Sequence, residues 1–262
     1  MRHPVPRAAV AAALLAFVAL PAAAEKAVTI DSRPGVTESF VLVDPPAKAI
    51  ASVLLLAGGN GFIHPGRFPD RLNQNFLVRT RASFARNGFL VAVLDVPSDH
   101  QQSGLFRWRD SDEHVADIAA AVKWLRAHDP APVWLVGTSR GSVSAAYAAA
   151  AIPVDGVVLT SSVTRPAKRD PTNVMEAKLG NIKVPVLITS HRDDDCPVTP
   201  PRDAERIKSA LTASPKVDIM LFEGGDAPRS EPCEALAQHG YIGIEDKVVD
   251  AIAGWIKAQT KH

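Results

Sequence analysis

A single serine stands between two glycines in the segment Gly137-Thr138-Ser139-Arg140-Gly141. The apolar run VWLV precedes this segment, and an alanine-rich run follows it. Where a strand turns sharply into a helix at a G-x-S-x-G sequence, the serine hydroxyl is exposed at the tip of the turn. The five letters alone are weak evidence, because a turn can contain glycine for other reasons. The strand-to-helix context favours Ser139 as a nucleophile.

A serine hydroxyl needs a histidine to accept its proton and a carboxylate to orient that histidine. Three consecutive carboxylates, Asp193 to Asp195, follow the apolar run VPVLITS. Of the eight histidines, only His239 and the terminal His262 come after the last predicted strand. The chain order therefore predicts a triad of Ser139, one of the three aspartates and His239. An acidic surface turn and an ordinary loop histidine are the alternatives.

The elements that must position these residues alternate between strands and helices. Two runs of alternating apolar residues within 26–46 predict a pair of strands joined by a turn at Arg33-Pro34-Gly35. Further strands are expected at 50–57, 89–97, 133–137, 154–162, 184–190 and 216–225, and helices at 76–87, 110–129, 142–151, 202–211 and 246–258. This alternation predicts an α/β fold with a mostly parallel central sheet and helices on both faces.

Composition and charge are those of a globular protein. The 262 residues are 47% apolar and 22% charged, and the formal net charge is +1. Such a balance gives no indication of a surface for nucleic acid or anionic membranes. Because no linker-like segment divides the chain, we expect a single domain over residues 25–262.

The first 24 residues have the pattern of a signal peptide. Arg2 and Arg7 precede an apolar run from Ala8 to Leu20, and Pro21–Ala24 supplies small residues at the cleavage site. The run is short for about 30 Å of hydrocarbon, which argues against an uncleaved anchor helix. We therefore expect an exported protein, periplasmic or secreted, with no stable membrane insertion after cleavage. Cleavage removes two arginines and no acid, so the net charge falls from +1 to −1.

Export changes the interpretation of the two cysteines. Cys196 and Cys233 are the only cysteines of the chain. In an oxidising compartment two such residues are expected to form a disulfide, whereas in the cytosol they would be free thiols.

The chain resembles the α/β-hydrolase superfamily from roughly Val28 to Ala258. Within it, the chain is similar to the branch of secreted bacterial esterases, lipases, cutinases and dienelactone-hydrolase-like proteins. The resemblance is carried by LLLAGGNG, GTSRG, SHRDDDCPVTPP and CEALAQHGYIG. In this family the acid often stands three residues after a glycine that ends its strand. Here His191 occupies the glycine position, so the resemblance implies Asp194 as the acid, with Asp193 and Asp195 as alternatives.

The resemblance also implies an oxyanion hole made of two backbone N–H groups. One is the N–H of Arg140, directly after the nucleophile. The other comes from the loop Ala57-Gly58-Gly59-Asn60-Gly61, where Ala57 replaces the family's usual histidine. Gly59 or Asn60 is the expected donor, and a glycine-rich turn without a role is the alternative. No lysine followed by serine or threonine follows these glycines, which argues against a phosphate-binding loop.

The cysteines lie beside the catalytic candidates. Cys196 follows Asp194 by two residues, and Cys233 precedes His239 by six. A bridge between them is therefore expected to tie the two catalytic loops together.

We expect an exported serine hydrolase that cleaves carboxylic esters through an acyl-enzyme. We expect no cofactor and no metal, since His191, the aspartates and His239 lack an H-E-x-x-H or C-x-x-C motif. About 20 residues separate Ser162 from Val184, which is too short for a large lid and favours small or accessible esters. Peptide, thioester or acyl-transfer chemistry on the same triad is one alternative, and a non-catalytic binding protein is another. Oligomeric state is not predicted.

Overall fold

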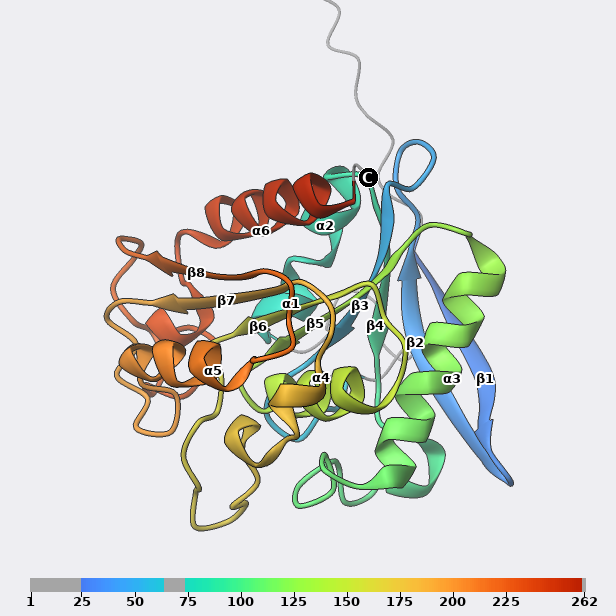
Figure 1. Ribbon diagram of the computed structural model, residues 1–262, viewed down its shortest axis with the longest axis horizontal. Helices are drawn as coiled ribbons and strands as arrows, with labels where there is room; N and C mark the ends of the chain where they lie inside the picture. The colour runs from blue at the N-terminus through green and yellow to red at the C-terminus, as the bar shows by residue number, and fades with distance from the viewer. Residues whose placement is uncertain (1–24, 64–73, 261–262) are drawn as a thin grey trace, which may run out of the picture.

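The computed structural model describes residues 25–63 and 74–260. The expected signal peptide, residues 1–24, lies outside the described residues. The described part contains an eight-stranded sheet with the order β1-β2-β4-β3-β5-β6-β7-β8 (Figure 1). The strands are β1 (Glu25–Arg33), β2 (Val36–Val43), β3 (Ala51–Leu56), β4 (Phe89–Leu94), β5 (Val133–Thr138), β6 (Gly156–Thr160), β7 (Val186–His191) and β8 (Val217–Phe222).

The sheet is parallel from β4 to β8, and β1 and β2 form an antiparallel edge. Every residue of β3 is buried, as its continuous apolar sequence predicts for a strand covered on both faces. Leu54 of β3 pairs with Ala92 of β4 on one side and with Leu135 of β5 on the other. The parallel strands therefore end at one common edge, where the loops that follow them meet. This confirms the predicted fold class.

Helices cover both faces of the sheet (Figure 1). On one face lie α1 (Phe76–Arg79), α2 (Arg81–Arg86) and α6 (Glu245–Gln259), and on the other α3 (Asp112–His128), α4 (Arg140–Ala151) and α5 (Ala204–Ala210). Each set buries apolar side chains against the strands, which gives two separate hydrophobic clusters. The helix expected at 76–87 is two short helices, because the backbone of Thr80 leaves the helical range with φ −98° and ψ 4°.

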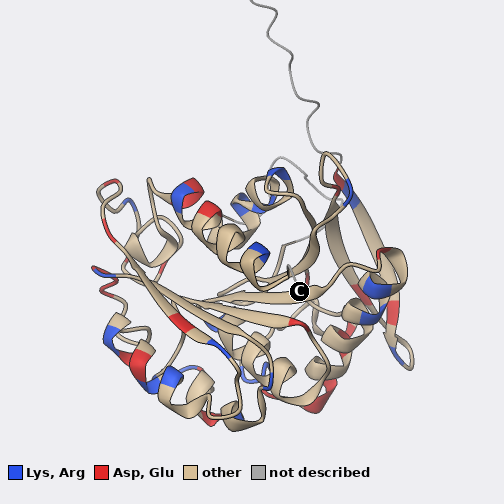
Figure 2. Cartoon of the chain, turned by 45° about the horizontal axis from the view of Figure 1, so that its top comes forward, with Lys and Arg blue, Asp and Glu red and all other residues tan. Residues whose placement is uncertain are grey.

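The segment between β6 and β7 contains only two short 3-10 helices, η3 (Val174–Glu176) and η4 (Leu179–Asn181). No helical lid is inserted there, as its length predicts. None of the helices in the described part of the chain is both long enough and apolar enough to cross a membrane. Basic and acidic residues are interspersed over the outer helices, whereas the central strands carry few charged residues (Figure 2).

One carboxyl group lies inside the sheet. Glu38 of β2 has no exposed surface, and its Oε1 accepts a hydrogen bond from the N–H of Ser39 at 3.0 Å. Asp117 of α3 is also fully buried and pairs with Arg33 at 2.8 Å. Burial, together with the charge of Asp117, raises the pKa of Glu38 well above its ordinary value of 4.5. The folded protein therefore keeps Glu38 protonated to a higher pH than the unfolded chain does.

This shift predicts a pH-dependent loss of stability. Above pH 4.5 the unfolded chain ionises Glu38 while the folded chain keeps it protonated, so the free energy of unfolding falls as the pH rises toward the raised pKa. The slope from this group is at most about 1.4 kcal/mol per pH unit. Glu38→Gln should remove this loss, so its free energy of unfolding relative to that of the wild type should rise as the pH increases above 4.5, measured by urea unfolding followed by circular dichroism. The exposed Glu113→Gln is the control, and parallel curves for all three proteins would contradict the prediction.

Candidate active site

Ser139 forms the turn between β5 and α4. Its backbone has φ 52° and ψ −125°, a left-handed conformation that residues with a Cβ rarely adopt. Such a conformation costs on the order of 1–3 kcal/mol and persists only where the surroundings hold it. Here the N–H of Ser139 donates to Thr160 O at 3.0 Å, and Ser139 O accepts from the N–H of Ser142 at 2.9 Å. These bonds tie the turn to β6 and to the first turn of α4.

The two glycines that flank Ser139 allow backbone segments to touch. A Cβ on Gly141 would lie 2.0 Å from the carbonyl oxygen of Leu56, the last residue of β3. A Cβ on Gly137 would lie 2.2 Å from the carbonyl oxygen of Gly141. Both distances are far below van der Waals contact, so α4 can begin directly against β3 only with glycine at these positions. The G-x-S-x-G sequence is therefore a packing requirement of this turn.

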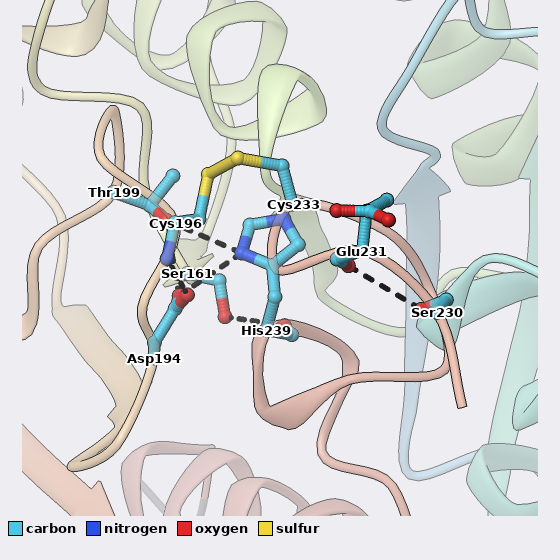
Figure 3. Close-up of a disulfide and its surroundings, with 8 residues drawn as sticks. All are labelled: Ser161, Asp194, Cys196, Thr199, Ser230, Glu231, Cys233 and His239. Atoms are coloured by element: carbon cyan, nitrogen blue, oxygen red, sulfur yellow. Dashed lines mark hydrogen bonds and ion pairs between the residues drawn. A yellow bond between two sulfur atoms is a disulfide. The ribbon is translucent and has the colours of Figure 1, made fainter. Parts of the chain in front are cut away.

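His239 and Asp194 form a hydrogen-bonded pair at the carboxyl edge of the sheet (Figure 3). Asp194 follows β7, and His239 lies in the 3-10 helix η6 (Gln238–Gly240) between β8 and α6. His239 Nδ1 lies 2.9 Å from Asp194 Oδ2, and the carboxylate also accepts from the hydroxyl of Thr199 and the N–H of Cys196, both at 3.0 Å. When the carboxylate is ionised it can only accept, so a neutral imidazole in this pair carries its proton on Nδ1 and has a lone pair on Nε2.

The backbone around His239 is anchored at three points. The hydroxyl of Ser161 donates to His239 O at 2.9 Å, and Arg79 Nη2 donates to Gly240 O at 2.6 Å. The ring of Tyr241 is fully buried, and its hydroxyl lies 3.0 Å from a threonine hydroxyl of β7. Burial raises the pKa of Tyr241 to about 12, so this hydroxyl stays neutral. The loop that carries the imidazole is thus hydrogen-bonded to three neighbouring segments.

Ser139 and His239 both line one cavity of about 610 Å³. His239 Nε2 is buried and has no hydrogen-bond partner among the described residues, and no hydrogen bond joins it to Ser139 Oγ. The cavity is lined by the loop 58–60, by Thr138 and Arg140, by the apolar side chains of Phe76, Phe106, Val163, Ala167, Pro197 and Val198, and by Asn75, Cys196, Cys233, Glu234, Ala235 and Gly240. The free imidazole nitrogen and the serine therefore belong to one largely apolar pocket.

Backbone donors are available beside Ser139. Across residues 25–63 and 74–260, no hydrogen bond engages the N–H groups of Gly59, Asn60 or Arg140. Arg140 is the first residue of α4, where the helix leaves its N–H groups unpaired and favours negative charge. Its guanidinium is held elsewhere, 2.7 Å from Asp170 Oδ2. The arrangement can place two N–H groups on an oxygen that gains negative charge next to Ser139.

Cys196 and Cys233 form a disulfide, as predicted. The bridge passes beside the imidazole of His239 (Figure 3). Since the N–H of Cys196 also donates to Asp194, the bridge links the loop that carries the acid to the loop that carries the histidine. Asp194, His239 and Cys196 have potential metal-ligand atoms within 4.8 Å of one another. The sulfur is in the disulfide and Nδ1 is in the pair with Asp194, so this group lacks the free donors of a metal site.

The three aspartates have different environments. Asp194 is buried and contacts His239, whereas Asp193 and Asp195 are exposed. His191, at the position of the family's glycine, is buried at the end of β7. Its Nε2 lies 2.9 Å from Gly224 O, and it is not one of the residues that line the cavity. Of the alternatives that the sequence left open, the structure brings only Asp194 to the histidine.

Three polar residues that support the site were not predicted from the sequence. Thr199 donates to Asp194, Ser161 donates to the backbone of His239, and Arg109 donates to the carbonyl groups of Ala57 and Gly59. Each is a single polar residue in a loop, with its partners 5 to 78 positions away along the chain. No motif or periodicity marks such residues, because their role depends on contacts made only after folding.

No family model and no curated protein sequence matches the chain. Several solved structures, however, are similar to the chain in fold. An esterase of Pyrococcus furiosus superposes with a TM-score of 0.66 at 15% identity, covering 90% of this chain and 91% of its own. A thermostable carboxyl esterase of Bacillus coagulans gives 0.62 at 14% identity, covering 90% and 99%. A serine hydrolase without lid from Xanthomonas campestris gives 0.57 at 15% identity, covering 90% and 94%.

These three proteins share the strand-and-helix arrangement with the present chain over nearly their whole lengths, although few residues are identical. A likeness at this level of identity is evidence of fold. Together with the sheet order and the turn at Ser139, it shows that this chain has the α/β-hydrolase fold.

Proposed function

We propose that this chain is a serine hydrolase that cleaves carboxylic esters through an acyl-enzyme intermediate. The observation that carries the proposal is the hydrogen-bonded pair of Asp194 and His239, whose free Nε2 belongs to the same cavity as Ser139. Acyl transfer through a serine requires a nucleophile, a base and an acid that orients the base, and this site contains all three.

In the proposed reaction Ser139 Oγ attacks the ester carbonyl, and its proton passes to His239 Nε2. Asp194 keeps the imidazole in the required tautomer and stabilises the imidazolium. His239 then protonates the leaving alcohol, and a water molecule, deprotonated by the same histidine, releases the acid from Ser139. Hydrogen bonds between nucleophile and base are often long in an empty site and shorten when substrate binds.

The tetrahedral intermediate carries its charge on the former carbonyl oxygen. In the proposal the N–H of Arg140 and that of Gly59 or Asn60 bind this oxyanion, since these donors have no other partner in the described part of the chain. The absence of a lid between β6 and β7 leaves the cavity accessible, and its lining is mostly apolar. We therefore assign small or accessible esters as the substrate class, and we propose that the protein acts after export and removal of residues 1–24.

The first test removes the nucleophile. Ser139→Ala should lower kcat for p-nitrophenyl esters by at least about 10³-fold, because the triad acts as a unit. It should also abolish labelling by a fluorophosphonate probe, while the melting temperature stays unchanged. The exposed Ser209→Ala on α5 is the matched control and should retain full activity. If Ser139→Ala keeps more than a tenth of the wild-type kcat, another nucleophile is at work. A wild type that is neither labelled nor active would favour a binding protein.

The second test identifies the acid. Asp194→Asn should lower kcat by about 10³- to 10⁴-fold, because an amide favours the wrong imidazole tautomer and cannot stabilise the imidazolium. Asp193→Asn and Asp195→Asn remove exposed carboxylates of the same turn and should change kcat less than twofold. Steady-state kinetics of the three purified variants decide the matter, and similar losses in all three would contradict the assignment.

The third test concerns the disulfide. The bridge closes a loop of 37 residues, for which chain entropy gives about 4 kcal/mol of stabilisation. Cys196→Ser with Cys233→Ser should therefore lower the melting temperature by about 8–16 °C. It should lower kcat more than it changes KM, because the bridge holds the histidine loop against the acid. Differential scanning fluorimetry and kinetics, each with and without reductant, measure both effects. A reductant effect on the serine double variant, or two free thiols in the oxidised wild type, would count against the bridge.

A further inference from the structure

Arg109 is a buried cation without an acidic partner. It lies between β4 and α3 with 1% of its surface exposed, and no carboxylate forms an ion pair with it within the described part of the chain. Its hydrogen-bond partners are neutral: Ser144 Oγ at 2.8 Å, Ala57 O at 3.0 Å and Gly59 O at 3.2 Å. A buried charge paired only with neutral groups is costly, so its position calls for an explanation beyond packing.

The two carbonyl groups that Arg109 binds flank the peptide between Gly58 and Gly59. A trans peptide holds its C=O and N–H antiparallel, so these bonds direct the N–H groups of Gly58 and Asn60 away from the guanidinium. Residues 58–60 line the cavity and Arg109 does not, which puts Arg109 behind the loop. The loop also touches the nucleophile, since a Cβ on Gly58 would lie 2.9 Å from Ser139 Cβ.

The same guanidinium is bonded to α4. Its Nη1 donates to the hydroxyl of Ser144, one turn beyond Arg140 along that helix. Arg109 therefore connects the two elements that would supply the oxyanion donors: the loop after β3, and the helix whose first residue is Arg140. A displacement of one element relative to the other would separate the two N–H groups.

The charge of Arg109 adds to this geometry. Burial, with a smaller contribution from the charge of Arg140, lowers the pKa of Arg109 to about 9, so the guanidinium remains charged at neutral pH. Asp170 is paired with Arg140 at 2.7 Å, which leaves Arg109 as an unpaired positive charge near the start of α4. A fixed positive charge close to the oxyanion donors favours a developing negative charge on the oxygen that they bind.

We propose that Arg109 is a positioning residue of the oxyanion hole: it holds the carbonyl groups of Ala57 and Gly59 so that the loop presents its N–H groups beside Ser139. The proposal rests on the function proposed above for this site, and it adds a residue that does not line the cavity and does not touch the substrate.

Arg109→Met is the main test. It should lower kcat by about 10²-fold with KM changed less than threefold, since the loop would lose its alignment while the apolar pocket remains. Affinity for a boronic acid, which forms a tetrahedral adduct with the serine, should fall in parallel with kcat/KM. Affinity for the product carboxylic acid should change little. Arg109→Lys keeps the charge but cannot bond the loop and Ser144 at the same time, so its kcat should lie between those of the wild type and Arg109→Met. It replaces Arg109→Met in the test if that variant fails to fold.

Arg33→Met is the matched control. It also removes a largely buried arginine, one that pairs with Asp117 and Asp99 and makes no bond to the loop. It should destabilise the protein without lowering kcat more than threefold. A kcat loss of less than threefold in both Arg109 variants, with an active wild type, would overturn the proposal.

Amide hydrogen exchange of the loop tests the positioning role independently of activity. Exchange over residues 57–61 should be at least tenfold faster in Arg109→Met than in the wild type, and unchanged in Arg33→Met. If the wild type hydrolyses no ester but the loop exchange responds in this way, the proposed function fails and the positioning of the loop by Arg109 stands. Unchanged loop exchange in Arg109→Met would overturn the proposal whatever the activity.

Discussion

The candidate site depends on one close approach between backbone segments: the start of α4 against the end of β3. A side chain on Gly141 would place its Cβ 2.0 Å from Leu56 O, so the contact exists only because that side chain is absent. Ser139, in the turn that leads from β5 to α4, has a left-handed backbone conformation with φ 52°. Ser139 also lies next to the loop after β3, since a Cβ on Gly58 of that loop would lie 2.9 Å from Ser139 Cβ. The nucleophile and the donors for an oxyanion thus arise from a single packing constraint.

The acid and the base are positioned by a second constraint, the common direction of the parallel strands. Because β7 and β8 run alongside β5 and β6, the loops that follow them reach the same edge of the sheet as Ser139. Loops alone are poor supports for a hydrogen bond that must keep its geometry. Here the disulfide between Cys196 and Cys233, the hydroxyl of Thr199 and the buried Tyr241 restrict both loops. The pair is thereby preorganised at the cavity wall.

Two buried ionisable groups lower the stability of the fold, because burial disfavours their charged forms. Burial raises the pKa of Glu38 inside the sheet, and it lowers the pKa of Arg109, behind the loop after β3, to about 9. Glu38 bonds the backbone of its neighbour Ser39, and it does not line the cavity that contains Ser139. Arg109 contacts the elements that would bind an oxyanion. Glu38 and Arg109 are both ionisable groups removed from water. They differ in the backbone groups that they contact.

Sequence alone was sufficient for the fold class, the approximate positions of the strands, the turn at Ser139 and the pairing of the two cysteines. Continuous apolar runs and a glycine-flanked serine are local signals, and local signals can be recognised without knowing the contacts. The choice of Asp194 over Asp193 and Asp195 needed the resemblance to a family, and the contact with His239 appears only in the folded chain. The break in the helix at Thr80 and the roles of Thr199, Ser161 and Arg109 were decided by the tertiary structure. Their hydrogen-bond partners lie elsewhere along the chain, so no pattern of neighbouring residues predicts these roles. Short-range order is specified by adjacent side chains, whereas a supporting hydrogen bond is specified only when distant segments are packed together.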